Sequence, residues 1–443
     1  MLDIAIIGGG IAGLSAAISL RRNGHTITVY EKSRFLSEIG AAITVPPNAL
    51  RELLRLGLDL ERAQATPKLQ SRLAHGTTLA PKVSESFRDC REHFGAEWHA
   101  FHRVDLHEEL RGLAQREGVN IILGTEIVRL DCEGGTLTTT DGTVIAKDLI
   151  VLSNGLHCKM LQQIVGEPVP PLKDTGSSTY RGLVPMEDVL RHPRLGEWWK
   201  NQDPGFYNFQ VPEKKLILVT YPARNNKLLN VVFVRRSDNM DRPRETDDWN
   251  QDASKQALLD AMEDFHPGVV ELVELLEEVK FFRTYTRDTL KRIQRGKVVV
   301  IGDAAHPMLP VLAQGAAQAI EDAAALGVIF PESSTVQSIS KRLNIYEKAR
   351  LGRGMATQLV SNSWWTMPRK ELEDKARELD ERIGSRLPPP DVELLSFEMR
   401  RLFQGFDASE DAKKVLDASG GFETTAGSDR GIEVRSGKPF ARL

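Results

Sequence analysis

Residues 3–31 read DIAIIGGGIAGLSAAISLRRNGHTITVYE, and this stretch decides the fold class. Its first apolar run predicts a strand over 2–7, and the Ala-rich segment at 11–22 predicts a helix. A second strand is expected over 26–30, so the stretch forms one β-α-β unit. A glycine-rich turn between the first strand and the helix is typical of an α/β fold that binds a dinucleotide.

Each glycine in this turn has a separate physical task. Gly8 permits the tight turn, Gly10 lets the backbone approach a pyrophosphate, and Gly13 lets the helix pack close to the strand. Helix N–H groups then face the phosphates. Glu31 ends the second strand, where a carboxylate hydrogen-bonds the ribose hydroxyls of an adenosine and repels a 2′-phosphate. The turn therefore predicts a site for FAD or NAD rather than NADP.

A second segment narrows the choice of dinucleotide. Residues 298–322 read VVVIGDAAHPMLPVLAQGAAQAIED, a buried strand that runs directly into Gly302 and Asp303. An aspartate at the carboxyl end of a strand suits a sugar or ribitol hydroxyl. The helix that begins near Gln314 offers free N–H groups and the positive end of its dipole, which stabilise negative charge on the pyrimidine edge of a reduced flavin. The segment therefore favours FAD.

The composition excludes several functional classes. With 58 Lys+Arg and 61 Asp+Glu the formal net charge is -3, which argues against a dedicated nucleic-acid or anionic-membrane surface. Three scattered cysteines support neither a disulfide framework nor a zinc site, so no metal is expected. We expect a cytoplasmic protein without a signal peptide or transmembrane segment. The final Ala441-Arg442-Leu443 is similar to the S-K-L peroxisomal signal, which keeps that compartment as an alternative.

The 443 residues suffice for two or three folding units. Alternating strands at 205–211, 215–221 and 228–236 predict an inserted antiparallel sheet. The expected fold class is α/β, with a Rossmann-like FAD-binding domain, an inserted antiparallel-sheet substrate domain and C-terminal helices. The expected divisions are the first part of the FAD-binding domain at 1–175 (with 76–100 open to the sheet domain instead), the sheet domain at 176–285, the second part of the FAD-binding domain at 286–365, C-terminal helices at 366–416, and a flexible tail at 417–443.

Together these motifs resemble those of the single-component flavoprotein aromatic hydroxylases, of the salicylate-hydroxylase type. The resemblance covers most of 1–365, and residues 403–415 are also similar. It includes two further motifs, Gly40-Ala41-Ala42-Ile43 followed by Pro46-Pro47-Asn48, and His102-Arg103-Val104-Asp105-Leu106. The FAD contacts that the resemblance implies are, for the ADP half, Gly8, Gly10, Gly13 and Glu31; along the cofactor, Ala42 and Arg103; at the ribitol, Asp303; and under the pyrimidine edge, Gly315 and Ala316.

The same resemblance implies an FAD-dependent monooxygenase. NAD(P)H would bind transiently and reduce FAD, and O2 would then give a flavin C4a-hydroperoxide that hydroxylates a small aromatic, phenolic substrate. Such a reaction needs a water-excluded pocket and a cation that holds the substrate as phenolate. Arg181 is the catalytic candidate for that cation, and Tyr221 is the matching tyrosine, with Tyr207 as its competitor. The expected partners are the substrate, O2 and NAD(P)H, in a monomer or homodimer.

One segment departs from the family's pattern. Residues 153–160 read SNGLHCKM where the family has Asp-Gly followed by Ser and Arg, so Asn154 replaces the acid and Leu161 stands at the arginine position. Charge is thereby lost where the nicotinamide donor is expected to be sensed. One interpretation is that NAD(P)H reduces the flavin slowly, or only when substrate is bound. The departure also motivates an alternative function, a flavin-scaffold isomerase or cyclase without net redox turnover.

The same residues also fit a different reaction and a different class of protein. Epoxidation of an indole or enol double bond in a natural-product pathway would use the same oxygen chemistry, and Arg181 suits either reaction. A non-enzymatic FAD-binding partner protein is the remaining class, although no interaction module is visible in the sequence.

Overall fold

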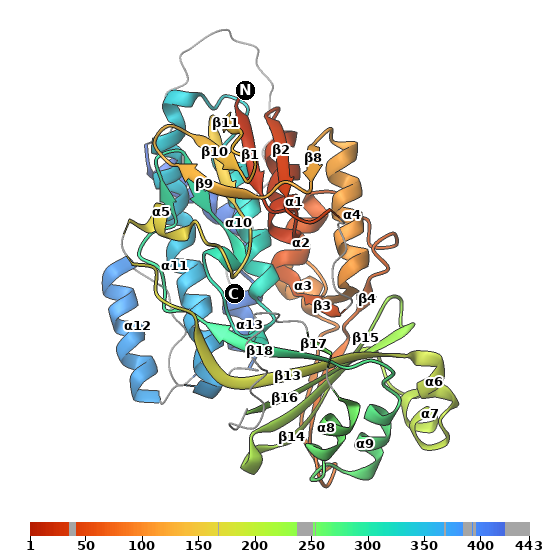
Figure 1. Ribbon diagram of the computed structural model, residues 1–443. Helices are drawn as coiled ribbons and strands as arrows, with labels where there is room; N and C mark the ends of the chain where they lie inside the picture. Colours follow the sequence, from red (N-terminus) through yellow and green to blue (C-terminus); the bar gives the residue numbers. More distant parts are fainter. Residues whose placement is uncertain are drawn as a thin grey trace, which may run out of the picture.

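The structure is a computed structural model, and it describes residues 1–34, 41–166, 168–236, 251–252, 254–366, 369–383, 392 and 396–420. Gly40 and the terminal Ala441-Arg442-Leu443 lie outside these residues, as does nearly all of the expected tail. Two large sheets form separate parts of the molecule, one above the other in Figure 1. Within the described ranges, every helix is too short or too polar to cross a bilayer.

The upper sheet has six strands in the order β19-β20-β12-β1-β2-β8. The strands are β1 (Asp3–Ile7), β2 (Thr26–Glu31), β8 (Asn120–Leu123), β12 (Leu149–Leu152), β19 (Gln294–Arg295) and β20 (Val298–Val300). All neighbours are parallel except β19, which is antiparallel to β20. Every residue of β12 and β20 is buried, as expected for central strands of a sheet that is covered on both faces. The strands expected at 2–7 and 26–30 are thereby confirmed.

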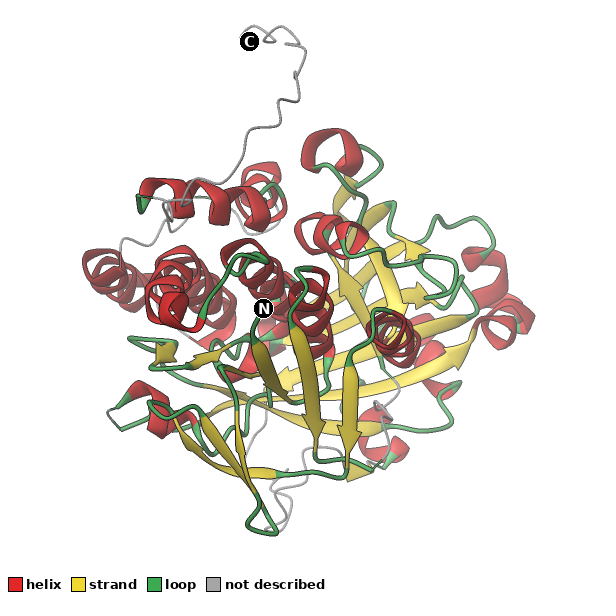
Figure 2. Cartoon of the chain, turned by 90° about the horizontal axis from the view of Figure 1, so that it is seen from above, coloured by secondary structure: helices red, strands yellow, loops and turns green. Residues whose placement is uncertain are grey.

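Helices pack closely on this sheet. They include α1 (Ile11–Arg22), α2 (Pro47–Arg55), α4 (Arg103–Arg116) and α10 (Gly315–Ile329). A Cβ at Gly327 of α10 would lie 2.0 Å from the hydroxyl oxygen of Ser19 on α1, so these two helices approach more closely than ordinary side chains allow. Figure 2 shows the helices packed side by side against the strands.

The lower sheet has eight strands in the order β17-β18-β13-β16-β15-β14-β5-β6. They are β5 (Gln70–His75), β6 (Pro81–Ser86), β13 (Lys173–Pro185), β14 (Gly205–Val211), β15 (Leu216–Ala223), β16 (Leu228–Arg236), β17 (Gln251–Asp252) and β18 (Lys280–Thr286). Neighbouring strands are antiparallel, except that β14 runs parallel to β5. The chain therefore enters this sheet twice, once through β5 and β6 and again from β13 onward.

The strands expected at 205–211, 215–221 and 228–236 are confirmed as β14, β15 and β16. The sequence pattern missed β13, whose polar residues and two glycines hide its 13-residue length. The helices that pack around this sheet are α6 (Met186–Arg191), α7 (Pro193–Trp199), α8 (Lys255–Asp260) and α9 (Pro267–Glu274). They enclose a second core around Phe233, separate from the core of the upper sheet. The sequence predicts a helix near 254–264, which α8 confirms, but it gives no sign of α6, α7 or α9.

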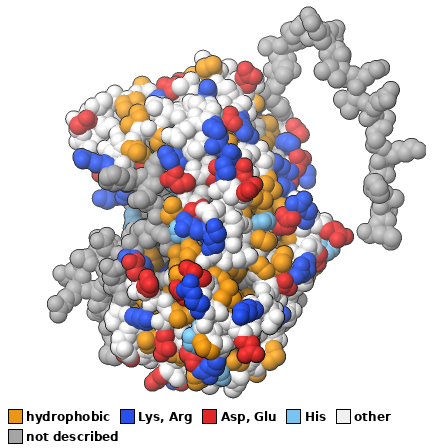
Figure 3. All heavy atoms as spheres, turned by 90° about the vertical axis from the view of Figure 1, so that its right-hand side faces the viewer, with side chains coloured by type: hydrophobic (Ala, Val, Ile, Leu, Met, Phe, Trp, Pro, Cys, Tyr) orange, Lys and Arg blue, Asp and Glu red, His pale blue; other side chains and the backbone are white. Residues whose placement is uncertain are grey.

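Smaller elements connect the two sheets and complete the chain. Three-stranded sheets are formed by β3 (Ala42–Val45), β7 (His99–His102) and β4 (Thr66–Pro67), and by β9 (Ile127–Asp131), β10 (Thr136–Thr139) and β11 (Val144–Ala146). The remaining helices are α3 (Cys90–Phe94), α5 (Leu161–Val165), α11 (Ile339–Thr366), α12 (Arg369–Ile383), α13 (Phe397–Gln404) and α14 (Ala408–Ala418). The face in Figure 3 mixes basic and acidic side chains, in agreement with the small net charge.

Candidate functional site

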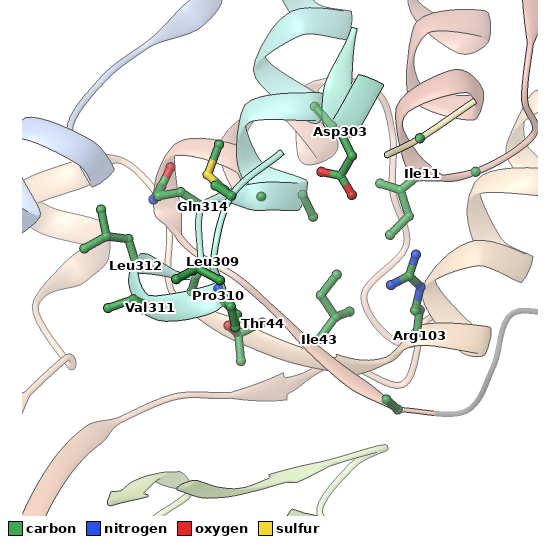
Figure 4. Close-up of a pocket in the computed structure, with 18 of the residues that line it drawn as sticks. Ile11, Ile43, Thr44, Arg103, Asp303, Leu309, Pro310, Val311, Leu312 and Gln314 are labelled. Atoms are coloured by element: carbon green, nitrogen blue, oxygen red, sulfur yellow. The ribbon is translucent and has the colours of Figure 1, made fainter. Parts of the chain in front are cut away.

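A cavity of about 950 Å³ lies between the two large sheets. The predicted cofactor residues that line it are Gly8, Gly10, Glu31, Ala42, Arg103, Asp303, Gly315 and Ala316, and the predicted catalytic residues that line it are Arg181 and Tyr221. Gly13 does not line the cavity and instead lies directly beneath Gly8. In Figure 4, Asp303 and Arg103 point into the same space from opposite sides. The fold thus gathers residues that are up to about 300 positions apart in the sequence.

The glycine turn has the geometry that a bound pyrophosphate requires. Gly8 has φ +105°, and a Cβ there would lie 2.7 Å from the carbonyl oxygen of Ser153. A Cβ at Gly13 would lie 2.0 Å from the carbonyl oxygen of Gly8, so the helix meets the strand too closely for any side chain. A Cβ at Gly10, the N-cap of α1, would meet nothing within 4 Å. The space in front of this helix N-terminus is therefore open to an anionic group.

Glu31 is held in place by main-chain donors. Its Oε2 accepts a hydrogen bond from the N–H of Gly9 at 2.8 Å, and its Oε1 accepts from the N–H of Ser33 at 2.8 Å. The carboxylate is thereby fixed at the end of β2, with lone pairs left over for ribose hydroxyls. His107, which the sequence reading missed, lies 2.7 Å through Nε2 from the carbonyl oxygen of Gly9 and is buried. Its one signal in the sequence is its position one helical turn after Arg103.

The Gly302-Asp303 turn rests on a buried charged network. Asp322 of α10 accepts from the N–H of Gly302 at 2.9 Å, and Nε2 of His306 lies 2.7 Å from the same oxygen. Arg350 of α11 donates to both Asp322 and Glu321, each at 2.8 Å. Burial opposes ionisation, but His306 and Arg350 outweigh it and hold the pKa of Asp322 at about 2. The network fixes the turn that carries Asp303 into the cavity.

Glu321 and Asp322 are adjacent on α10, and adjacent helical residues point about 100° apart, so they do not form a carboxylate pair for catalysis. They do differ in direction, and one guanidinium spans both. The sequence reading missed this arrangement because Arg350 comes from a different helix. Its role is structural, since none of the three residues lines the cavity.

The structure separates the two tyrosine candidates. The Tyr221 hydroxyl donates to the carbonyl oxygen of Ala42 at 3.0 Å, and its ring lines the cavity. The Tyr207 hydroxyl instead donates to the carbonyl oxygen of Asp203 at 2.6 Å, and its ring packs on Trp199 away from the cavity. Burial raises the pKa of Tyr221 to about 12, with Arg181 opposing the rise. Tyr221 is therefore the candidate that can meet a ligand.

Arg181 lies in the middle of the eight-stranded sheet, opposite Val232 of β16. Its guanidinium carbon lies 5.3 Å from the centroid of the Phe282 ring, and its Nε has no hydrogen-bond partner among the described residues. Burial and the nearby Arg103 lower its pKa, while Tyr221 raises it. A guanidinium stays charged across the physiological range, so Arg181 can pair with an anionic oxygen in the cavity.

Lys68 is a further buried basic residue near the cavity, and the sequence alone did not identify it. Its Nζ lies 4.3 Å from the centroid of the Tyr221 ring and donates to the carbonyl oxygen of Pro222 at 3.1 Å. The residue is 1 % exposed, and burial lowers its pKa well below the ordinary value. Lys68 supports the Tyr221 ring from behind, because it does not itself line the cavity.

The altered segment at 153–160 retains positive charge nearby. Ser153 Oγ donates to the carbonyl oxygens of Ile7 and Gly8 at 2.9 and 3.1 Å, which ties the end of β12 to the glycine turn. His157 and Lys159 line the cavity. Arg287, from beyond the end of β18, donates to the carbonyl oxygen of Leu156 at 3.4 Å.

Leu161, at the position where the resembling family has arginine, is 1 % exposed within the core. An arginine could not occupy that place without burying its charge. The guanidinium of Arg287 reaches the same segment from a different part of the chain.

Comparisons with known proteins agree with this geometry. The sequence model of a family described as "FAD binding domain" matches residues 1–363. An FAD-dependent monooxygenase of Aspergillus candidus is 34% identical over 369 residues, which are 82% of this chain and 85% of that protein. The hispidin-3-hydroxylase of Neonothopanus nambi is 31% identical over 407 residues, 87% of this chain and 95% of that protein. The fold of a salicylate hydroxylase substrate complex matches with a TM-score of 0.73 at 22% identity, over 94% of this chain and 98% of that one.

Proposed function

The chain belongs to the FAD-binding monooxygenase family, and from this premise we propose that it hydroxylates a small phenolic compound with NAD(P)H and O2. One observation carries the proposal: a single cavity joins the glycine turn to Arg181 and Tyr221. A cofactor bound at the turn and a substrate bound at the sheet would therefore share one cavity. The hydroxylase named among the relatives supports the same reaction class.

The residues present fit FAD. The open space at Gly10 suits the pyrophosphate, the fixed carboxylate of Glu31 suits the ribose, and Asp303 at the end of β20 suits the ribitol. Gly315 begins α10 at the cavity wall, so the positive end of that helix faces the space for the flavin ring. When bound, FAD supplies the redox chemistry that moves electrons from NAD(P)H to O2 and makes an electrophilic oxygen available.

The chain's own residues prepare the substrate. Arg181 would pair with the phenolate oxygen and thereby favour the ionised ring, whose ortho and para carbons are electron-rich. Phe206, Val219 and Val232 line the cavity around it and exclude water, which protects the reactive oxygen and strengthens the ion pair. Tyr221 would hold the ring in place through its fixed edge, because its hydroxyl is already bound to the main chain at Ala42.

Anaerobic stopped-flow absorbance near 450 nm tests the proposal on the purified holoenzyme. We expect NADPH or NADH to bleach the flavin, and a phenol that fits the cavity to accelerate the bleaching strongly. Mixing the reduced enzyme with O2 should then give a product that has gained one oxygen atom on the ring. Absence of bleaching with either donor, under conditions where a phenol perturbs the flavin spectrum, would contradict the proposal and favour the isomerase alternative. An epoxide or its rearranged product from an indole or enol would instead support the epoxidase alternative.

A further inference from the structure

The cavity continues beyond Arg181 to a second group of polar side chains on α13. Arg400 and Gln404 of this helix line the cavity together with the apolar Met399 and Phe403. Residues four apart on a helix lie on the same face, so the guanidinium and the amide are neighbours there. This helix lies outside the 1–363 range that the family's sequence model matches.

Polar atoms at this end of the cavity are buried and lack partners. Among the described residues, no hydrogen-bond partner exists for Nη1 of Arg400, Oε1 of Gln404 or Nε1 of Trp98. Gln404 is 5 % exposed, Trp98 is 8 % exposed, and the Arg400 side chain is 12 % exposed. Buried polar atoms are nearly always paired in folded proteins. Three unpaired atoms around one cavity therefore indicate a ligand that supplies the missing hydrogen bonds.

An aromatic wall connects this end with the Arg181 end. Ring centroids are 5.4 Å apart for Tyr221 and Phe206, and 5.2 Å apart for Phe206 and Trp98. Trp98 stacks on Phe87 at 4.9 Å, and the guanidinium of Arg400 lies 5.1 Å from the Phe87 ring. All five side chains line the cavity. Such a continuous wall suits a flat, elongated ligand whose two ends meet different polar groups.

The charges at the α13 end favour a neutral oxygen. Nε of Arg400 lies 3.4 Å from Oε2 of Glu85 on β6, so the guanidinium already has a counter-charge. Burial raises the pKa of Glu85, and Arg400 lowers it. Burial also raises the pKa of the adjacent Cys90 thiol to about 11, so this thiol adds no charge. A ligand carboxylate would meet Glu85, whereas a carbonyl or hydroxyl oxygen could accept from Arg400 without that repulsion.

The position of α13 is fixed from both sides. Arg353 of α11 donates to the carbonyl oxygens of Leu402 and Phe403 at 3.1 and 2.9 Å. Arg51 of α2 donates to the carbonyl oxygen of Phe406, just beyond the helix, at 2.5 Å. The polar groups of this face are thus held in place before a ligand arrives, which lowers the entropy cost of binding.

We propose that the α13 end, formed by Trp98, Arg400 and Gln404, binds a neutral carbonyl or hydroxyl oxygen at the far end of an elongated phenolic substrate. This inference rests on the proposed function, because it assumes that the other end of the substrate, the ring to be hydroxylated, meets Arg181. Arg400 is accordingly a specificity-determining residue that selects the substrate by its tail.

Three phenols with para substituents of similar length test the inference on the FAD-loaded enzyme. They are 4-hydroxybenzylideneacetone with a neutral ketone tail, 4-butylphenol with no tail oxygen, and 4-hydroxycinnamate with a carboxylate tail. Titration of the flavin absorbance gives each Kd. We expect the ketone to bind about tenfold tighter than 4-butylphenol, and Arg400→Gln to abolish this difference while changing the Kd of 4-butylphenol less than twofold. Arg400→Lys should restore part of it.

Matched variants separate recognition from folding. Arg401→Gln changes an exposed neighbour on the same helix and should leave all three Kd values unchanged. Glu85→Gln removes the counter-charge and should strengthen binding of 4-hydroxycinnamate at least threefold. The FAD content and visible spectrum of each variant report its folding. If Arg400→Gln loses FAD, Gln404→Leu takes its place in the comparison of the ketone with 4-butylphenol.

Two outcomes would overturn the inference. One is equal binding of the ketone and 4-butylphenol by the unaltered enzyme, and the other is an equal loss for both compounds in Arg400→Gln. In either case, phenol-stimulated oxidation of NAD(P)H would leave the proposed function standing. If no phenol perturbs the flavin or stimulates NAD(P)H oxidation, both proposals fail together.

Discussion

The two ends of the cavity are built in different ways. At the glycine end, main-chain groups form the surface, and one short stretch of sequence supplies most of them. Gly8 and Gly10 line the cavity without side chains, and Gly13 lets α1 pack closely beneath Gly8. At the sheet end, side chains form the surface and come from segments far apart in the sequence, such as Glu85, Arg181 and Arg400. A surface of the first kind suits one cofactor. A surface of the second kind can change its ligand by substitution without disturbing the cofactor.

A pair of alanine substitutions tests the first half of this comparison, and we expect it to show the largest effect. Gly13→Ala would place a Cβ 2.0 Å from the main-chain oxygen of Gly8, whereas Gly10→Ala would place one in open space. Overpacking against main chain that cannot move costs roughly 3 kcal/mol of the free energy of unfolding, or more. Urea unfolding of the apoprotein should show this loss for Gly13→Ala and almost none for Gly10→Ala.

FAD binding should rank the same two variants differently. The methyl group of Gly10→Ala occupies space expected for the pyrophosphate, so this variant should fold normally and yet hold FAD weakly. Equilibrium dialysis measures the difference. Tight FAD binding by Gly10→Ala would show that the cofactor does not approach α1 there.

Arg181→Met tests the sheet end and should give the next largest effect. Removing a charge that stabilises developing negative charge costs about 100-fold in turnover. We expect product formation to fall by that factor while the flavin spectrum and FAD content stay unchanged. The control is Arg401→Gln, which changes an exposed arginine outside the cavity. If Arg181→Met keeps a turnover within threefold of that of the unaltered enzyme, Arg181 does not take part in catalysis.

The network beneath the Asp303 turn predicts a pH-dependent stability. The pKa of Asp322 is about 2 in the folded protein against 3.8 ordinarily, so its contribution is complete above pH 4 to 5 and is lost as the pH falls toward 2. The shift corresponds to about 2 kcal/mol of unfolding free energy. Asp322→Asn should lower the melting temperature at pH 7 and flatten its fall between pH 5 and 3. Asp417→Asn, an exposed carboxylate on α14, should do neither.

Substitution of the two tyrosines should give the smallest effects, and the effects should differ in kind between Tyr221 and Tyr207. Tyr221→Phe removes a hydroxyl at the cavity wall and should lower turnover severalfold, whereas Tyr207→Phe should leave turnover unchanged and cost about 1 kcal/mol of stability. Because burial places the pKa of Tyr221 at about 12, turnover between pH 6 and 10 should not follow its ionisation. If steady-state assays instead showed a loss of turnover for Tyr207→Phe and none for Tyr221→Phe, Tyr207 rather than Tyr221 would be the tyrosine that meets the substrate.

The sequence indicates the cofactor end far better than the substrate end. Gly8, Glu31 and Asp303 sit at fixed positions after strands, and such positions follow from local pattern alone. His107 and Lys68 were not identified from the sequence because each acts through contacts with residues that are distant in the sequence. Arg400 was not identified either, because nothing in the sequence pattern indicates that α13 packs over the cavity beside the eight-stranded sheet.

The same reasoning applies to the fold. Strands β12 and β20 are buried on both faces, so their sequences are continuous apolar runs that predict a strand. Strands β5 and β6 read QSRLAH and PKVSES, with no apolar alternation. Strand β5 pairs with β14 along one edge and with β6 along the other. Their place in the sheet depends on tertiary pairing rather than on local preference.

The parallel pairing of β14 with β5 also constrains the order in which the protein can assemble. About 130 residues separate the two strands, so β5 and β6 leave the ribosome long before their partner is made. At typical synthesis rates of about 5–20 residues per second, this hairpin waits for roughly 7 to 26 seconds with one edge unpaired. Its polar, charged sequence suits that interval, because it offers little to neighbouring chains while it waits. These two strands, which carry little apolar pattern, are thus also strands that must stay soluble while their partner is made.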